Sequence, residues 1–312
     1  MNILIYGIGG VGGFFGAKLT NTENHITFFA RGKHLKAIQE NGLQIKSFQV
    51  DFTAVPDLAT DDLKKIEKPD LVILGVKSWQ ITDTAKALKP YLKPETVVLP
   101  LQNGAANADK LVEVLPKENV IAGLCRIISF IEGPGVIKHP AFNPTITFGE
   151  LDNSKTKRIE NIKAIFDKAE INSSIAENIQ AEIWKKFLFI CTISGIGGLT
   201  RVPIGRIRES EYLYKIMKDT AQEILAIAQA KGVNINQEDV DKTFTGIDNQ
   251  NPETTASTQR DIMEGKPSEL ENFNGYIVKQ GLELGIPTPA NKMIYECLLP
   301  MEKAVRAKSK GV

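Results

Sequence analysis

The pattern of apolar and polar residues changes near the middle of the chain. In the first half, short apolar runs bounded by glycine or proline alternate with longer amphipathic segments, as in buried parallel strands joined by helices. The predicted strands are residues 2–6, 25–31, 69–77 and 96–104, and the predicted helices are residues 12–22, 33–42 and 79–92. This order favours an α/β domain with a doubly wound, mostly parallel sheet.

The pattern of apolar residues becomes purely helical after one further set of strand, helix and strand. We expect a strand at 146–150, an amphipathic helix at 155–169 and a closing strand at 171–177. Beyond these, apolar residues recur at three- and four-residue spacing, as on the buried face of a helix. The helical runs are residues 178–194, 211–232, 261–285 and 291–308. The sequence therefore predicts a dinucleotide-binding α/β domain over 1–176 and an all-α domain over 177–312.

Composition and charge narrow the class of protein. The 312 residues are 42% hydrophobic and 24% charged, with a formal net charge of +1. This is ordinary for a soluble globular protein and provides no overall field for nucleic acid or an acidic membrane surface. The apolar run at 187–199 is too short and too interrupted for a transmembrane helix, which needs about 20 residues. Residues 1–7 lack the basic start of a signal peptide, so we expect a cytoplasmic protein that binds neither nucleic acid nor membrane.

The cysteines and histidines indicate neither disulfides nor a metal site. Cys125, Cys191 and Cys297 are far apart and odd in number, without the spacing of metal ligands or of a disulfide framework. We expect all three to be small buried side chains in a reducing compartment. The histidines at 25, 34 and 139 are equally scattered, so no metal is predicted.

The first apolar run leads directly into a glycine-rich loop. Gly7, Gly9 and Gly12 match the pattern G-x-G-x-x-G, in which the glycines permit a tight turn, the approach of a diphosphate and close packing of helix on strand. The helix N-terminus then offers N–H groups and a partial positive charge to the phosphates. The expected cofactor-binding residues of the loop are Gly7, Ile8, Gly9, Gly10, Val11 and Gly12. The glycines at 195–198 follow no buried strand, and we interpret them as a helix end or bend.

The end of the second predicted strand bears on which nucleotide is bound. An NAD site places Asp or Glu there to bind the ribose 2′-hydroxyl, whereas this chain has Arg31 and Lys33 and no acidic residue. A guanidinium suits a 2′-phosphate in its charge and in its fork of donors. These residues favour NADP(H) as the cofactor, and the alternative is a solvated basic turn.

Four further stretches carry a family resemblance: VKSWQ at 76–80, LQNG at 101–104, AEIWKKF at 181–187 and SELENFNGY at 268–276. With the glycine loop, and in this order over essentially the whole length, the sequence resembles the ketopantoate reductase family. The resemblance implies a Rossmann NADP-binding domain and a helical substrate domain, with the active site in the cleft. It also implies the reduction of 2-dehydropantoate (ketopantoate) to pantoate with NADPH, a step of pantothenate biosynthesis.

By this resemblance, Lys186 matches the family's catalytic lysine. An ammonium can donate the proton that the developing alkoxide needs and can stabilise its charge. Lys185 points about 100° away on a helix and cannot share the role. Taken without the resemblance, Lys186 is an ordinary solvated helix residue.

Two residues match the family's substrate-binding positions. Glu269 matches a glutamate whose carboxylate can accept a hydrogen bond from a substrate hydroxyl, and Glu271, which would face elsewhere on a helix, is the alternative. Ser257 matches a serine that helps to bind the substrate carboxylate. A serine at this place could equally cap a helix N-terminus.

Asn103 and Lys77 each lie at the end of a predicted strand. The amide of Asn103 could orient both ribose and substrate, and Lys77 could pair with a cofactor phosphate or with the substrate carboxylate. The alternatives are a turn asparagine and an exposed lysine.

The chain departs from the family pattern on the helix that carries Lys186. Well-known members have asparagines four and eight residues after the lysine, on the same helix face, where they can hydrogen-bond to substrate. This chain has Ile190 and Ser194 there; Ser194 is the predicted substrate contact, with a shorter reach, and Ile190 makes no hydrogen bond. Because a lost hydrogen bond can change discrimination between substrates, the main alternative is a reductase or dehydrogenase for a different 2-oxoacid or hydroxyacid. A further alternative is a non-enzymatic NADP(H)-binding regulator. The expected partner is a small 2-oxoacid, and a homodimer is a possible assembly.

Overall fold

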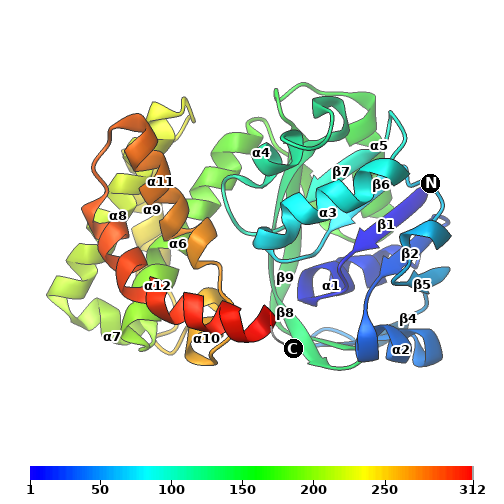
Figure 1. The fold of residues 1–312 in the computed structure, drawn as a ribbon, viewed down its shortest axis with the longest axis horizontal. Helices are drawn as coiled ribbons and strands as arrows, with labels where there is room; N and C mark the ends of the chain where they lie inside the picture. The colour runs from blue at the N-terminus through cyan, green and yellow to red at the C-terminus, as the bar shows by residue number, and fades with distance from the viewer. Residues whose placement is uncertain (311–312) are drawn as a thin grey trace. The chain divides into compact units, whose positions relative to one another are not determined.

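The chain forms two compact units (Figure 1). The computed structural model describes residues 1–310. The first unit runs from Met1 to Ile179, and the second begins at Gln180. Each unit has a hydrophobic core of its own.

A parallel sheet with the strand order β5-β2-β1-β6-β7 forms the centre of the first unit. Its strands are β1 (Asn2–Tyr6), β2 (His25–Phe29), β5 (Leu58–Thr60), β6 (Leu71–Leu74) and β7 (Val97–Pro100). The associated helices are α1 (Gly10–Leu19), α2 (Gly32–Asn41), α3 (Ile81–Leu88) and α4 (Asn107–Val112), with short 3-10 helices η1 (Leu63–Lys65), η2 (Ser78–Gln80), η3 (Lys89–Tyr91) and η4 (Lys117–Asn119). The predicted doubly wound parallel sheet is thus confirmed.

Three of these strands are shorter than the apolar pattern predicts. They end at Phe29, Leu74 and Pro100 rather than at 31, 77 and 104. The residues beyond those points are loops, although Ala30, Leu101 and Gln102 are still buried, so an apolar run does not by itself mark where a strand ends. The loops carry the candidate site residues.

A second sheet, which the hydrophobic pattern does not reveal, completes the first unit. Its strand order is β10-β9-β3-β4, and β8 pairs antiparallel with β9. The elements are β3 (Leu43–Ser47), β4 (Phe52–Ala54), β8 (Ile121–Gly133), β9 (Val136–Glu150), α5 (Lys157–Lys168) and β10 (Asn172–Ile175). The predicted strand at 146–150 is only the end of β9, and the predicted closing strand is β10 in this second sheet. The pattern misses β8 because its first five residues are all buried whereas most later ones are exposed, so no single period describes it.

Helix α1 contacts strands of both sheets, and seven of its ten residues are buried. Its glycines permit this close approach. A Cβ on Gly13 would lie 2.9 Å from Ile137 on β9, and a Cβ on Gly16 would lie 3.0 Å from Ile5 on β1. Packing from two sides therefore fixes the helix that begins at the glycine loop.

The second unit consists of helices, as predicted. They are α6 (Ile179–Thr200), α7 (Ile204–Glu209), α8 (Glu211–Ala230), α9 (Gln237–Asp248), α10 (Ser257–Met263), η5 (Leu270–Asn272), α11 (Asn274–Leu284) and α12 (Pro289–Lys310). The predicted helical run at 261–285 is wrong in its middle part. Gly265 has a φ of +63°, which leaves the helical region, and Pro267 cannot continue a helix. Glu269 therefore lies in a turn.

Helix α6 corrects two interpretations of the sequence. The glycines at 195–198 do not end a helix, because α6 continues to Thr200. A Cβ on Gly195 would lie 2.7 Å from Asn274 Oδ1, so this glycine permits close packing with α11. With 22 residues, α6 is also long and apolar enough to cross a membrane, although most of it is buried in the protein, as in the core helix of a globular domain.

The cysteines follow the sequence prediction in two cases of three. Cys125 and Cys191 are buried, but Cys297 is exposed. On α12 the buried positions Ile294 and Leu298 are four residues apart, and Cys297 lies about 100° around the helix from Leu298. The helix period overrides the general tendency of cysteine to be buried.

Candidate functional site

Four loops of the first unit emerge at one edge of the parallel sheet. Strands β2, β1, β6 and β7 are consecutive neighbours and run in parallel. The loops after them carry Gly7–Gly12, Arg31, Lys77 and Asn103. Because parallel strands end at the same edge, the fold brings these four segments to the place where open α/β sheets bind their ligands.

The segment Gly7–Gly12, which joins β1 to the first turn of α1 and which we call the glycine loop, is tightly enclosed at most of its glycines. Gly7 has a φ of +99°, a conformation that favours glycine. A Cβ on Gly12 would lie 2.1 Å from Gly7 O, and a Cβ on Gly10 would lie 2.2 Å from Ser129 O on β8. Gly7 and Gly12 thus serve the turn and the close contact of helix with strand, whereas Gly10 is required by the second sheet.

Gly9 differs from these glycines, because the space beside its Cα is open. Among the described residues, a Cβ there would have just one neighbour within 4 Å, Gly75 O at 3.7 Å. Gly9 is the N-cap residue of α1, it offers no side-chain cap, and the first turn of α1 contains no acidic residue. The N–H groups of that turn and the positive end of the helix dipole suit a diphosphate. The loop therefore fits a dinucleotide.

Arg31 follows β2 and is exposed, and no acidic residue occurs in 30–39. Its guanidinium carbon lies 5.8 Å from the centre of the Phe29 ring, within cation–π range. The Phe29 ring in turn stacks on Tyr6 with 4.3 Å between ring centres. Arg31 thus places a guanidinium beside an aromatic ring at this edge of the sheet, where it can bind an anionic group.

Lys77 lies between β6 and η2 and is also exposed. Its backbone N–H donates to Gln80 Oε1 at 3.1 Å, and its ammonium lies 5.6 Å from the centre of the Trp79 ring. Lys77 thus provides a cation at the same edge of the sheet.

The turn that carries Asn103 is held by a side chain of α4. Asn107 Nδ2 donates to the carbonyl oxygens of Gln102 at 2.9 Å and Gly104 at 3.3 Å. Gly104 has a φ of +127°, so glycine is favoured at this turn. The position of Asn103 is therefore set by its neighbours on both sides.

Gln102 is a further candidate that the sequence motif did not single out. Its Nε2 donates to Leu74 O at 2.8 Å, which fixes which end of the amide is the oxygen. Its Oε1 is buried and has no hydrogen-bond partner within residues 1–310. Such an acceptor can take a donor group of a bound molecule. In the sequence, Gln102 could be identified as a candidate only because it stands next to Asn103.

In the second unit, Lys186 lies on α6 with Ile190 and Ser194 four and eight residues later. This spacing puts all three on one face of the helix. The neighbouring side chains of Trp184 and Phe187 are 2% and 1% exposed. Burial of these rings fixes the rotation of α6 and hence the direction of the Lys186 face.

Lys185 faces a different direction. Its ammonium lies 3.3 Å from Glu182 Oε1 and 3.6 Å from Asp239 Oδ1. As expected from the helix period, Lys185 has acidic partners of its own and is separate from Lys186.

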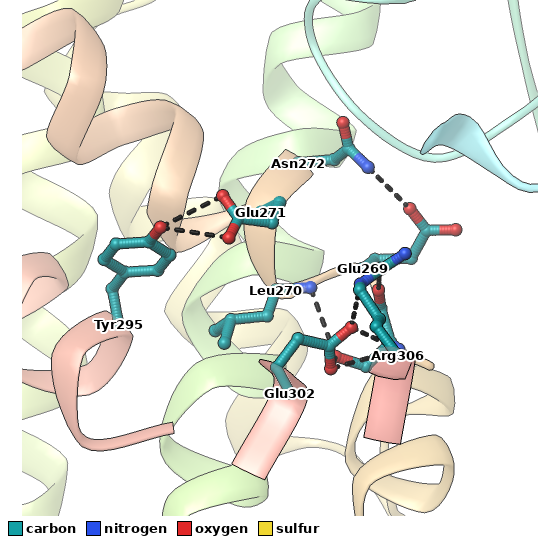
Figure 2. Close-up of polar contacts among 8 residues, drawn as sticks. Glu269, Leu270, Glu271, Asn272, Tyr295, Glu302 and Arg306 are labelled. Carbon is teal, nitrogen blue, oxygen red and sulfur yellow. Dashed lines mark hydrogen bonds and ion pairs between the residues drawn. The ribbon is translucent and has the colours of Figure 1, made fainter. Parts of the chain in front are cut away.

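Glu269 and Glu271 diverge in the turn before α11 (Figure 2). Glu269 is 8% exposed, and its Oε2 accepts from Asn272 Nδ2 at 3.3 Å. Both oxygens of Glu271 instead lie 3.0 Å from the hydroxyl of Tyr295. Burial and the Glu271 charge raise the pKa of Tyr295 to about 12, so this phenol stays neutral. Glu271 is thus engaged with α12, whereas Glu269 lies apart from that contact.

Ser257 is the first residue of α10 and is exposed. The N-cap is Ala256, whose N–H donates to Gln259 Oε1 at 3.2 Å. The helix-capping alternative for Ser257 is therefore wrong, and its predicted contact with substrate stays a prediction.

Within residues 1–310, no group of three or more His, Cys, Asp or Glu side chains could hold a metal ion. His34 Nδ1 accepts from Gly135 N at 2.9 Å, and the buried His139 contacts Ser47. Both histidines serve the structure of the first unit.

A glycine loop at the carboxyl edge of a parallel sheet, followed by a helical unit, defines a dinucleotide-binding protein of the Rossmann class. Comparison with protein families goes further. The model described as "Ketopantoate reductase PanE/ApbA" matches residues 3–153, and the one described as "Ketopantoate reductase PanE/ApbA C terminal" matches residues 178–302. The chain belongs to the ketopantoate reductase family, whose members are NAD(P)-dependent oxidoreductases.

Individual relatives cover nearly the whole chain. It is 32% identical over 301 residues to 2-dehydropantoate 2-reductase of Pyrococcus abyssi, covering 95% of this chain and 96% of the relative. The crystal structure of a PanE/ApbA family ketopantoate reductase from Ralstonia eutropha is 30% identical with a TM-score of 0.90, covering 98% of this chain and 100% of the other. D-mandelate dehydrogenase, determined with NADH and anilino(oxo)acetate, shares the fold at 22% identity with a TM-score of 0.88, covering 98% of this chain and 100% of the other.

Proposed function

We propose that this protein reduces 2-dehydropantoate to pantoate with NADPH, in pantothenate biosynthesis. The observation that carries the proposal is the sheet edge that combines an open diphosphate loop with Arg31 in place of an acidic residue. Residues 1–176 would bind the cofactor, and residues 177–312 would supply the substrate and proton-donating groups. Membership of the ketopantoate reductase family supports the reaction.

The candidate residues have distinct roles in this reaction. The backbone of Gly7–Gly12 binds the diphosphate, Arg31 binds the 2′-phosphate, and Lys77 and Asn103 bind nearby cofactor groups. When bound, NADPH supplies the hydride that the ketone carbon receives. Lys186 donates a proton from its ammonium to the carbonyl oxygen of the substrate and stabilises the developing negative charge.

The substrate is oriented by side chains of the helical unit. Glu269 accepts a hydrogen bond from the substrate hydroxyl, Ser257 binds the carboxylate, and Ser194 contacts the substrate from the face of α6 that carries Lys186. The partners are thus NADP(H) and a small 2-oxoacid. We further propose a cytoplasmic protein that binds neither nucleic acid nor membrane, with a homodimer as the assembly to test by size-exclusion chromatography with light scattering.

Turnover of NADPH tests the function directly. Loss of NADPH absorbance is followed with 2-dehydropantoate and with a panel of branched 2-oxoacids. We expect 2-dehydropantoate to give the highest kcat/KM. Absence of turnover on the whole panel, by protein that binds NADPH, would remove the proposal.

A different substrate is the second candidate, and Ile190 favours it. An aliphatic side chain four residues after Lys186 makes the wall of the substrate site more apolar, which disfavours a polar substrate. The shared fold of D-mandelate dehydrogenase shows that this architecture accommodates another activity. Higher kcat/KM for an apolar 2-oxoacid, or for its hydroxyacid with NADP, would favour this candidate. The non-enzymatic alternative predicts NADPH binding without turnover in either direction.

A matched pair of variants tests the proposal that Lys186 is the proton donor. Lys186→Ala should lower kcat by at least about a hundredfold, because a general acid contributes that much or more, while the NADPH dissociation constant stays nearly the same. Lys185→Ala is the control, since it removes a neighbouring charge from another face of α6. Equal kcat in the two variants would exclude Lys186 as the proton donor.

A further inference from the structure

Ser268, the residue before Glu269, is held by α12 through all of its polar groups. Its N–H lies 3.1 and 3.2 Å from the two carboxylate oxygens of Glu302, and its hydroxyl donates to Glu302 Oε2 at 2.6 Å. Its carbonyl oxygen accepts from Arg306 Nη2 at 2.7 Å, and its Oγ accepts from Leu270 N at 3.3 Å. Figure 2 shows Glu302 and Arg306 beside the turn that bears Glu269.

Glu302 is buried with its charge compensated. It is 5% exposed, and Arg306 Nε, one helical turn later, lies 2.6 Å from Glu302 Oε1. A buried carboxylate needs such a cation and several donors, because the loss of solvation is otherwise costly. Ser268, Glu302 and Arg306 therefore form one connected group, which we call the Ser268 clamp.

The backbone on the other side of Glu269 is also held. The Glu269 carbonyl oxygen accepts from the N–H groups of Asn272 at 2.9 Å and Phe273 at 3.0 Å. Leu270 is 1% exposed and packs in the core of the second unit. Glu269 thus lies between the Ser268 clamp and a short 3-10 turn, so its backbone has little freedom.

We propose that Glu302 and Arg306 are positioning residues, which hold Ser268 so that Glu269 presents its carboxylate to the substrate in one orientation. This inference rests on the proposed function, in which Glu269 binds the substrate. A buried ion pair contributes little more to stability than apolar side chains of the same volume would. Because the Glu302–Arg306 pair contacts Ser268, the residue next to Glu269, it points to a positioning role rather than to stability alone.

The first test is Glu302→Gln. The amide keeps the volume of the side chain but removes the negative charge that Arg306 and the donors of Ser268 share, so the clamp loosens. We expect KM for the 2-oxoacid substrate to rise about tenfold, the effect of losing one hydrogen bond to a charged group. We expect kcat to change less than about threefold, since Lys186 is untouched, and the NADPH dissociation constant to stay the same.

Glu223→Gln is the matched structural control. Glu223 on α8 is also a carboxylate that holds α12, because it accepts from Ala290 N at 2.7 Å and from Asn291 N at 2.9 Å. Both variants should lower the melting temperature, but only Glu302→Gln should raise KM. An equal rise of KM in both variants would mean a general loosening of α12 and would overturn the proposal.

A double-mutant cycle separates this proposal from the proposed function. If Glu302 acts through Glu269, then adding Glu302→Gln to Glu269→Gln should raise KM no further than Glu269→Gln alone. If the KM effects of the two substitutions instead multiply in the double variant, Glu302 does not act through Glu269. That result would overturn the positioning role but leave Glu269 as a substrate residue. An unchanged KM in Glu269→Gln would instead remove Glu269 from the proposed function, and the positioning role with it. Arg306→Ala should raise KM as well. Arg306→Lys, which keeps the charge but not the fork of donors, should raise KM less than Arg306→Ala does.

Discussion

At the scale of single residues, adjacent glycines of the loop after β1 are required for different reasons. The space beside Gly9 is open apart from Gly75 O at 3.7 Å, whereas a Cβ on Gly10 would overlap Ser129 O at 2.2 Å. The sequence pattern of the loop does not distinguish the reasons for which Gly9 and Gly10 are glycine. The structure assigns Gly10 to packing against β8 and leaves open space beside Gly9, where we propose that the diphosphate binds.

Alanine at these positions should therefore have separable effects. Gly9→Ala should fold with a melting temperature near that of the wild type, since its φ of −87° suits alanine, but it should bind NADPH more weakly. Gly10→Ala should lower the melting temperature, because the backbone of β8 must move. Thermal melts with and without NADPH test both. A Gly9→Ala protein with unchanged NADPH affinity would contradict the proposed place of the diphosphate.

Arg31 is the residue on which the choice of nucleotide depends. Arg31→Ala should weaken NADPH binding by about tenfold or more and NADH binding much less, because only NADPH carries the 2′-phosphate. Lys33→Ala is the control, since it removes an exposed cation from the same turn. Dissociation constants from fluorescence titration give the comparison. Equal losses for both nucleotides would place Arg31 at a group that the two share.

At the scale of elements, a histidine joins two strands of the second sheet. His139 on β9 is 0% exposed. Its Nε2 lies 3.0 Å from Phe142 O, so this nitrogen carries the hydrogen, and its Nδ1 accepts from Ser47 Oγ on β3 at 2.9 Å. Burial lowers the pKa of His139, and it lowers the pKa of His34 in the same unit as well.

This arrangement predicts a loss of stability in mild acid. The folded protein holds His139 with a lowered pKa, whereas the unfolded chain binds a proton below about pH 6.5. Stability should therefore be fully present above that pH and should fall as the pH drops toward the lowered pKa of the folded state. Thermal melts between about pH 7.5 and 5.5 should show the decline, with a shallower slope in His139→Gln. An unchanged slope in that variant would mean that other groups cause the acid sensitivity.

Helix α6 shows why an element can be predicted while its details are not. Its apolar spacing predicts a helix, but the glycines at 195–198 suggest an interruption. The pattern cannot show that Gly195 faces Asn274 on α11 and that Gly197 faces Gln259, whose Oε1 would lie 2.5 Å from a Cβ. Close packing between helices is the reason for these glycines, and it is a property of the assembled unit.

At the scale of the whole molecule, the hydrophobic pattern predicts four of the five strands of the parallel sheet, all but β5, and the helical unit, since buried strands and amphipathic helices leave distinct patterns. The second sheet does not, because β8 changes from fully buried to largely exposed along its length. The turn with Glu269 is likewise hidden within a run of helical spacing, which Gly265 and Pro267 interrupt. Prediction fails where burial is decided by a distant segment rather than by local period.

The sequence by itself determined the glycine loop, the basic residue in place of an acidic one at Arg31, the alternation of β1, β2, β6 and β7 with helices, the helical second half, and the family to which the chain belongs. These are local or linear features, readable from residue type and spacing. Only the tertiary structure decided that Gly10 serves the second sheet, that the buried Gln102 Oε1 has no hydrogen-bond partner among residues 1–310, and that Glu302 and Arg306 hold the residue before Glu269. Each of these joins segments far apart in the chain, so no local pattern could contain it.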